Sequence, residues 1–164
     1  MDEFEINYNR ALRFLSFRPR SEKEVSDYLK KKLSYFRAPE EDKRKIEDTI
    51  KKITDRLKKH SFINDDEFAR IWISQRTKIK PRALRVIKQE LLLKGIVKEK
   101  IEELLGKGEN EIPSDFQMAF VMAQKRAKRY KNLEKKEFFE KMGRFLASKG
   151  FNYDTIKEVI AKIN

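Results

Sequence analysis

The feature that most constrains the fold is a spaced pattern of apolar residues around a Lys-Gly pair, which occurs twice in the chain. Seven positions match at the same internal spacing, which is hard to attribute to chance. The two copies are Leu91-x-x-Lys94-Gly95-Ile96-x4-Ile101-x-x-Leu104-Leu105 and Leu146-x-x-Lys149-Gly150-Phe151-x4-Ile156-x-x-Val159-Ile160. A repeated pattern of this length predicts a repeated structural unit, and the units of such an array stack on their neighbours to bury a core.

A shorter pattern extends the repeat to the N-terminal third of the chain. In three places an alanine precedes an arginine by seven residues, namely Ala11 and Arg18, Ala69 and Arg76, and Ala119 and Arg126. Each pair lies in the first helix of a segment that has room for three helices. We therefore predict an all-α fold of three tandem three-helix repeats, over about 1–60, 61–106 and 113–164, which form an elongated, curved array.

Composition and periodicity both favour helices. Gly (5) and Pro (4) are few, and charged residues, mostly the helix-forming Lys and Glu, make up 41% of the chain. Apolar residues recur at helical spacing, as at Ile46, Ile50, Ile53 and Leu57. The expected helices cover 5–17, a segment from Ser21 with the apolar stripe Val25, Leu29, Leu33 and Phe36, and then 40–59, 65–78, 81–94, 97–105, 114–130, 134–149 and 152–163.

Local signals mark where several of these helices begin and end. Capping boxes are predicted at Ser21 with Glu24, Asn64 with Glu67 and Ser114 with Gln117, and Ile63 with Phe68 forms a hydrophobic staple. Pro81 suits the first position of a helix. Gly95 and Gly150 suit left-handed C-caps, and the segment from Gly106 to Pro113 is typical of a linker. Gly143, inside an expected helix, is predicted to allow a close helix contact.

The charge of the chain limits its partners. Lys and Arg number 40 against 27 Asp and Glu, and the formal net charge is +13. Such a charge attracts polyanions, such as nucleic acid, an anionic membrane or an acidic protein surface; a surface that only maintains solubility is the alternative. The lack of Cys excludes disulfides and thiolate metal sites and agrees with a reducing compartment. We expect neither a secretory signal nor a membrane-spanning helix.

Two dense basic clusters contain the candidate binding residues. Between 70 and 94 the basic residues are opposed only by Glu90, and they are Arg70, Arg76, Lys78, Lys80, Arg82, Arg85, Lys88 and Lys94. The second cluster is opposed only by Glu134, and it comprises Lys125, Arg126, Lys128, Arg129, Lys131, Lys135 and Lys136. Arg76 and Arg126 occupy the same repeat position, which predicts a basic stripe that crosses neighbouring repeats.

This basic stripe is expected to contact phosphates or protein carboxylates, and a solvated helix face is the alternative. Arg76, Arg82 and Arg85 are preferred over the lysines, because a guanidinium can bind either group through two parallel hydrogen bonds. The full set expected to bind is Arg70, Arg76, Lys78, Lys80, Arg82, Arg85, Lys88, Lys125, Arg126, Lys128 and Arg129.

Other site chemistries find little support in the sequence. Asp65, Asp66 and Glu67 are better explained as carboxylates at a helix start than as metal ligands. The segment Gly106-Lys107-Gly108 lacks the spacing and the Ser or Thr of a phosphate-binding loop. Trp72 and Phe68 are expected in the core, and His60 has no Ser or Cys partner pattern. We predict no enzyme activity, no metal and no cofactor.

Several of these segments resemble the RecX family of regulatory proteins. The family's central signature is similar to Phe62-Ile63-Asn64-Asp65-Asp66-Glu67-Phe68-Ala69-Arg70-Ile71-Trp72-Ile73-Ser74-Gln75-Arg76 and to Ile87-Lys88-Gln89-Glu90-Leu91-Leu92-Leu93-Lys94-Gly95-Ile96. Its first repeat is similar to Ala11-Leu12-x-x-Leu15 and Arg18-Pro19-Arg20-Ser21-x-x-Glu24-Val25. The resemblance covers essentially the whole chain. The sequence departs from the family pattern at Leu33–Pro39, where a glycine is usual, at Lys80-Pro81, where Gly-Pro is usual, and in the linker at 106–113.

The resemblance implies a protein that binds the RecA recombinase, mainly its filament on single-stranded DNA. Such a protein would lie in the filament groove, hinder filament extension and reduce ATP hydrolysis and strand exchange, as part of DNA repair, homologous recombination and the SOS response. We expect a cytoplasmic monomer without a cofactor or a membrane partner, which contacts DNA directly or through the filament. The alternative is a sequence-independent nucleic-acid-binding repeat protein with no recombinase partner.

Overall fold

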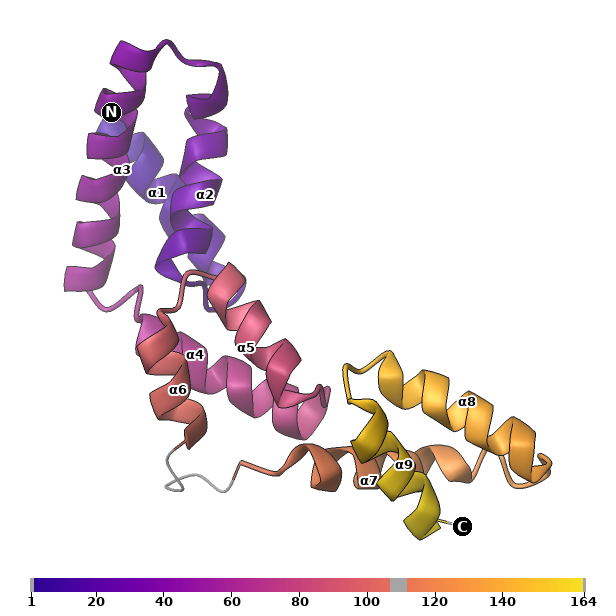
Figure 1. Cartoon of the computed structure of the whole chain (residues 1–164). Coiled ribbons are helices and arrows are strands. Elements are labelled where there is room, and N and C mark those ends of the chain that lie inside the picture. The colour runs from indigo at the N-terminus through magenta and orange to yellow at the C-terminus, as the bar shows by residue number, and fades with distance from the viewer. Residues whose placement is uncertain (1, 107–111, 164) are drawn as a thin grey trace. The chain divides into compact units, whose positions relative to one another are not determined.

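The computed structural model of the chain describes residues 2–106 and 112–163, and within these ranges it contains helices and no strands (Figure 1). The elements are α1 (Glu3–Ser16), α2 (Glu22–Lys32), the 3₁₀ turn η1 (Tyr35–Arg37), α3 (Glu40–Lys59), α4 (Asp65–Ser74), the π-helical segment η2 (Gln75–Ile79), α5 (Leu84–Leu93), α6 (Lys98–Gly106), α7 (Asp115–Ala127), α8 (Lys135–Ala147) and α9 (Tyr153–Ile163). The predicted all-α class is confirmed. Most of the expected linker between Gly106 and Pro113 lies outside the described residues.

The capping boxes predicted at Ser21 and Ser114 are confirmed. At Ser21 and at Ser114 the hydroxyl accepts a hydrogen bond from the N3 amide, and the Glu24 or Gln117 side chain accepts one from the cap amide. For the box predicted at Asn64, one of the two bonds is shown: Asn64 Oδ1 accepts a hydrogen bond from the Glu67 amide at 3.1 Å. Each bond satisfies an N–H group that has no partner inside its helix.

Two expectations about helix ends are wrong. Phe36 does not continue the stripe of α2, because the helix stops at Lys32 and Ser34 takes a left-handed conformation (φ 56°). The chain therefore turns, and Phe36 lies in η1 with 72% of its surface exposed. Pro81 does not begin a helix either. α5 starts only at Leu84, where the backbone N–H groups of Ala83 and Leu84 are bound by Lys149 O and Asp115 Oδ1.

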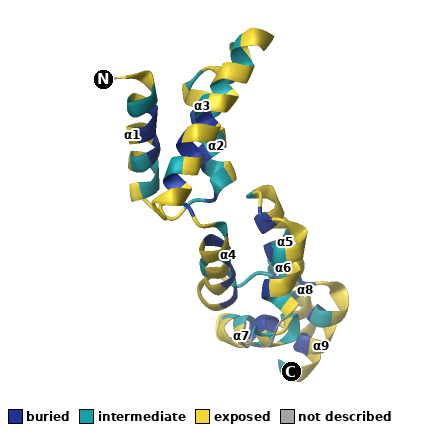
Figure 2. Cartoon of the chain, turned by 90° about the vertical axis from the view of Figure 1, so that its left-hand side faces the viewer, coloured by how far each residue is buried: buried dark blue, intermediate teal, exposed yellow. Residues whose placement is uncertain are grey.

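The chain divides into two compact units, and each has a core of its own. The first comprises residues 1–70 and 92–100, so it holds α1, α2 and α3 together with one edge of the middle triplet. Its buried core draws on all three N-terminal helices (Figure 2) and comprises Tyr8, Ala11, Val25, Leu29, Ile50, Ile53, Leu57 and Ile63. The stripe predicted for α3 is confirmed, because Ile50, Ile53 and Leu57 are buried in this core.

The second unit comprises residues 71–91 and 101–164, and it holds the other edge of the middle triplet with α7, α8 and α9. Its core comprises Ala83, Met118, Ala119, Ala123, Phe138, Met142, Leu146, Phe151, Ile156, Val159 and Ile160. The close contact predicted at Gly143 is not found: a Cβ there would lie 4.0 Å from Ile156 Cγ2 on α9, which is an ordinary van der Waals distance, so the packing of α8 on α9 does not require glycine at this position.

Each unit contains the same joint between successive triplets. In the first unit, Asp65 at the start of α4 accepts a hydrogen bond from the Glu22 amide at the start of α2, at 2.8 Å. In the second unit, Asp115 at the start of α7 accepts one from the Leu84 amide at the start of α5, also at 2.8 Å. A carboxylate of one triplet thus caps a helix of the triplet before it.

A left-handed glycine completes each joint, as predicted for the Lys-Gly turns. Gly95 has φ +83°, and a Cβ on it would lie 2.7 Å from Lys23 Cβ on α2. Gly150 has φ +92°, and a Cβ on it would overlap Val86 Cγ2 on α5. Glycine is therefore required at both positions for backbone conformation and for space.

We expect the substitution Gly150→Ala to destabilise the protein by about 2–4 kcal/mol, because it adds left-handed strain and a clash with Val86. Gly106→Ala is the matched control, since a Cβ at this helical glycine meets nothing within 4 Å. Urea unfolding of both variants measures the difference. Equal stability of the two variants would contradict this account of the joint.

Glu24, in the first unit, is a carboxylate whose pKa is strongly lowered by its hydrogen-bond partners. Burial alone would raise its pKa, but hydrogen bonds from Arg18, Lys94 and the Ser21 amide lower the pKa to about 2. Arg18 Nη2 lies 2.7 Å and Lys94 Nζ 2.9 Å from Glu24 Oε1. The carboxylate therefore links α2 to the turn that follows α5.

This lowered pKa predicts an acid-sensitive contribution to stability. The ionised form stabilises the fold above the ordinary pKa near 4.5, and the contribution disappears as the pH falls through about 2. We expect Glu24→Gln to cost about 2 kcal/mol at neutral pH, allowing for solvent screening, and to cost almost nothing near pH 2. The control Glu40→Gln removes a carboxylate that is 83% exposed. A constant difference between wild type and Glu24→Gln across a pH series of unfolding curves would refute the assignment.

Candidate functional site

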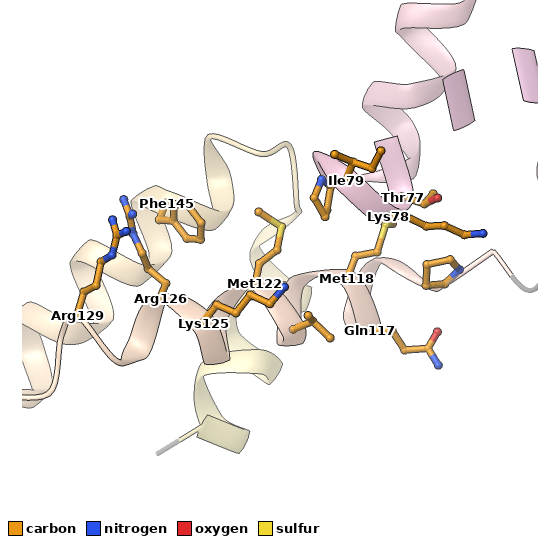
Figure 3. Close-up of a pocket in the computed structure, with 13 residues that line it drawn as sticks. Thr77, Lys78, Ile79, Gln117, Met118, Met122, Lys125, Arg126, Arg129 and Phe145 are labelled. Atoms are coloured by element: carbon orange, nitrogen blue, oxygen red, sulfur yellow. The ribbon is translucent and has the colours of Figure 1, made fainter. Parts of the chain in front are cut away.

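A groove of about 420 Å³ lies within the second unit (Figure 3). It is lined by residues of η2 and α7, by Phe145 of α8 and by Pro81, Pro113 and Arg129, which lie outside the helices. Its first wall is η2, whose wide turn is closed by the bond from the Lys80 amide to Gln75 O at 2.9 Å. The Thr77 hydroxyl is buried and donates to Ile73 O at 2.9 Å. This anchor leaves Lys78 and Ile79 to line the groove, and Ile79 is 72% exposed.

The second wall is one face of α7. Gln117, Val121 and Lys125 follow one another at four-residue spacing, so they share a side of the helix. The neighbouring Met118 and Met122 also line the groove, while Ala119 and Ala123 point into the core. In Figure 3, the two methionines lie between a basic end at Arg126 and Arg129 and a second end at Lys78 and Gln117.

The groove combines positive charge with an apolar floor. Its four cations are Lys78, Lys125, Arg126 and Arg129, and its described lining contains no Asp or Glu. None of these cations forms an ion pair with another described residue. The field inside the groove is therefore positive and uncompensated by neighbouring carboxylates, which favours an anionic ligand.

Arg126 is held in place by rings. Its guanidinium carbon lies 4.5 Å from the centroid of Phe145, and its Nε donates to the Tyr130 hydroxyl at 3.2 Å. These contacts orient the guanidinium and leave its charge unneutralised. A fixed cation loses less side-chain entropy when it binds a ligand than a freely rotating lysine does.

The equivalent arginine of the middle triplet has a different environment. Arg76 Nε donates to Glu90 Oε2 at 2.7 Å, and its guanidinium lies 4.7 Å from the Trp72 ring centroid. Trp72 Nε1 donates to the same Glu90 oxygen at 2.8 Å. Trp72 is half-buried, whereas the sequence predicted it in the core. Since Leu91 and Leu146 are equivalent, Phe145 stands in the third triplet where Glu90 stands in the second.

Three further predicted binding residues have partners inside the second unit. Arg82 Nη1 donates to Ser148 O at 2.8 Å, and Arg85 Nε donates to Gly150 O at 2.6 Å. Both arginines thus fasten the start of α5 to the turn between α8 and α9. Lys88 Nζ lies 3.8 Å from Glu102 Oε1. The preference for Arg76, Arg82 and Arg85 as external contacts overlooked these internal partners.

The remaining predicted residues are exposed and lie outside the groove lining. Arg70 is on α4 in the first unit, Lys80 follows η2, and Lys128 caps α7. The structure thus brings together Lys78 of the first basic cluster and Lys125, Arg126 and Arg129 of the second. The predicted binding role of all these residues stays a prediction.

The apolar floor was missed by the sequence analysis. Ile79, Pro81, Val121, Met122 and Phe145 contribute to it. One signal was available: Val121 lies on the same face of α7 as Lys125, away from the buried Ala119 and Ala123, and it is 48% exposed. An apolar residue in line with cations points to a contact surface.

The described part of the chain contains neither a metal-binding cluster nor a membrane-spanning helix. No group of three acidic or histidine side chains there is placed to hold a metal ion. The Asp65 carboxylate instead accepts a hydrogen bond from the Glu22 amide, and burial raises its pKa. No described helix is long and apolar enough to cross a membrane.

The division between internal and free cations predicts different effects on stability. We expect Arg85→Ala to cost about 1–3 kcal/mol, because it leaves the half-buried Gly150 carbonyl without its charged donor. Lys125→Ala removes a cation with no partner among the described residues and should change stability by less than about 0.5 kcal/mol. Thermal unfolding of the two variants compares them, and a large loss in Lys125→Ala would show that the groove cations are structural.

Comparison with known proteins finds consistent similarities. Models of the first, second and third three-helix domains of RecX match residues 8–33, 64–105 and 114–160. The regulatory protein RecX of Bacillus pumilus is 34% identical over 97% of this chain and 56% of its own length. That of Clostridium beijerinckii is 37% identical over 93% of this chain and 66% of its own. The chain thus spans only a little over half the length of several curated relatives.

Solved structures give the same result. A crystal structure of RecX from Lactobacillus salivarius superposes with a TM-score of 0.65 at 28% identity, covering 97% of this chain and 95% of that one. A second crystal structure, of a regulatory protein RecX, gives 0.67 at 25% identity, covering 96% and 73%.

Proposed function

Because the chain belongs to the RecX family of regulatory proteins, we propose that it binds the RecA recombinase and its filament on single-stranded DNA and inhibits filament extension, ATP hydrolysis and strand exchange. The observation that carries the proposal is that all three RecX domain models match, in order, along one chain. The proposal is of a non-enzymatic, cytoplasmic regulator that acts as a monomer and contacts DNA directly or through the filament.

The groove of the second unit supplies a physical route to such binding. A recombinase filament on DNA presents protein carboxylates and phosphates, and four cations without a described ionic partner face the groove. Inhibition by binding to the filament requires no catalytic group on this protein. A protein bound along a filament could block both the addition of monomers and the subunit motions that accompany ATP turnover.

The net charge of +13 favours one other function, which is sequence-independent binding of nucleic acid without a recombinase. If the protein neutralised 6–10 phosphates, its affinity would fall roughly 10³–10⁵-fold between about 50 and about 200 mM salt. A gel shift of an oligodeoxythymidine across that salt range measures this. A flat salt response would count against the alternative.

The proposal predicts that the full chain reduces the DNA-dependent ATPase activity of a cognate RecA. We expect Lys125→Glu to require about ten times more protein for half-inhibition, because one charge reversal in a binding site costs more than about 1 kcal/mol. Lys157→Glu is the matched control: it is an exposed lysine inside α9, has no described ionic partner and lies outside the groove. Unchanged ATP hydrolysis at saturating wild-type protein would sink the proposal.

A further inference from the structure

We propose that the groove of the second unit binds an acidic peptide segment that carries a large apolar side chain, rather than a nucleotide chain. The proposal rests on the function proposed above for the identity of the partner, which would be a segment of the recombinase. On this proposal the ligand of the groove is a protein segment, and any contact with DNA is made by basic residues outside the groove.

The floor of the groove is the first reason. Ile79 is 72% and Val121 48% exposed, and both line the groove together with its cations. Burying a side chain such as Leu or Phe against them would remove apolar surface from water on both partners. A ligand with charged groups alone would leave this apolar surface exposed to water. The floor therefore predicts a ligand that carries an apolar side chain close to its anionic groups.

The shape of the apolar surface argues against nucleotides. Single-stranded nucleic acid is bound by stacking bases on exposed aromatic rings. This floor is mainly aliphatic and sulfur-containing, and its aromatic ring, Phe145, has the Arg126 guanidinium 4.5 Å from its centroid. Aliphatic and methionine side chains instead accommodate the varied side chains of a peptide.

The middle triplet shows which anion suits this arginine position. There the acceptor for Arg76 is a carboxylate, Glu90, which binds the guanidinium at 2.7 Å. In the third triplet the equivalent residue is Phe145, so Arg126 occupies the same repeat position as Arg76 but has no carboxylate there. A carboxylate from a partner would restore the interaction that the chain makes within its own middle triplet.

The test measures fluorescence anisotropy of labelled probes with the full chain. The probes are the peptide Asp-Glu-Leu-Phe-Glu-Asp, its analogue Asp-Glu-Ser-Ser-Glu-Asp and an oligodeoxythymidine of equal formal charge. We expect the Ser analogue to bind about ten-fold more weakly than the Leu-Phe peptide, because it cannot use the floor. Lys125→Glu should weaken the Leu-Phe peptide by a similar factor, and Lys157→Glu should not.

A floor variant separates peptide from nucleic acid. Ile79→Ser should weaken the Leu-Phe peptide by about five-fold and leave the oligodeoxythymidine unchanged. Leu93→Ser is the matched control, since Leu93 is also the last residue of its helical segment and is 77% exposed. Circular dichroism checks folding, and Val121→Ser repeats the test on α7. Equal weakening of the oligonucleotide by Ile79→Ser, equal binding of the two peptides, or no saturable peptide binding would each overturn the proposal.

The ATPase assay keeps this proposal distinct from the proposed function. If wild-type protein inhibits the recombinase but the peptide results fail, the groove assignment is wrong and the regulatory function stands. If the peptides bind as expected but wild-type protein has no effect on the recombinase, the groove assignment stands and the regulatory function fails.

Discussion

The structure depends on one interaction that is used twice, a carboxylate that accepts the backbone N–H at the start of a helix in the preceding triplet. The first N–H groups of any helix lack intrahelical partners, and in an array some of them are covered by the next repeat and lose access to water. Asp65 Oδ1 accepts a hydrogen bond from the Glu22 amide and Asp115 Oδ1 accepts one from the Leu84 amide, each at an N–O distance of 2.8 Å. A charge-assisted bond of this kind contributes about 1.5–3 kcal/mol, and its loss would leave a half-buried donor unsatisfied.

The joints explain why the middle triplet is divided between the two compact units. A three-helix segment of this size buries little apolar surface by itself, so each of its edges packs on the neighbour that it faces. Residues 65–70 and 92–100 carry Asp65 and Gly95 and belong with α1–α3, while Ala83 belongs to the core of α7–α9. The boundaries at 1–60, 61–106 and 113–164 describe the sequence repeat and stay a prediction. The two hydrophobic cores instead correspond to the two compact units, which divide the middle triplet.

Much of the local structure could be predicted because its causes are local. The capping boxes at Ser21 and Ser114 and the left-handed glycines Gly95 and Gly150 depend on a few consecutive residues, and the structure confirms them. Features that depend on distant residues were missed. No local signal marks the π-helical turn at η2, and the start of α5 is set by Asp115 and Lys149 rather than by Pro81. For the same reason, charge along the sequence did not distinguish Arg85, bound to Gly150 O, from Lys125.

The groove and the second joint are built from the same stretch of chain, so the groove forms only when the middle and third triplets are assembled. Lys78 and Ile79 belong to the middle triplet, while Val121 and Lys125 belong to the third. What holds these two groups together is the segment that follows η2, where Arg82, Ala83 and Arg85 are bonded to the α8–α9 turn. The arginines bonded at this joint are not available to external ligands, but their bonds hold together the backbone segments that carry the groove cations. Loss of Arg82 or Arg85 would therefore change the geometry of the groove as well as the charge of the surface.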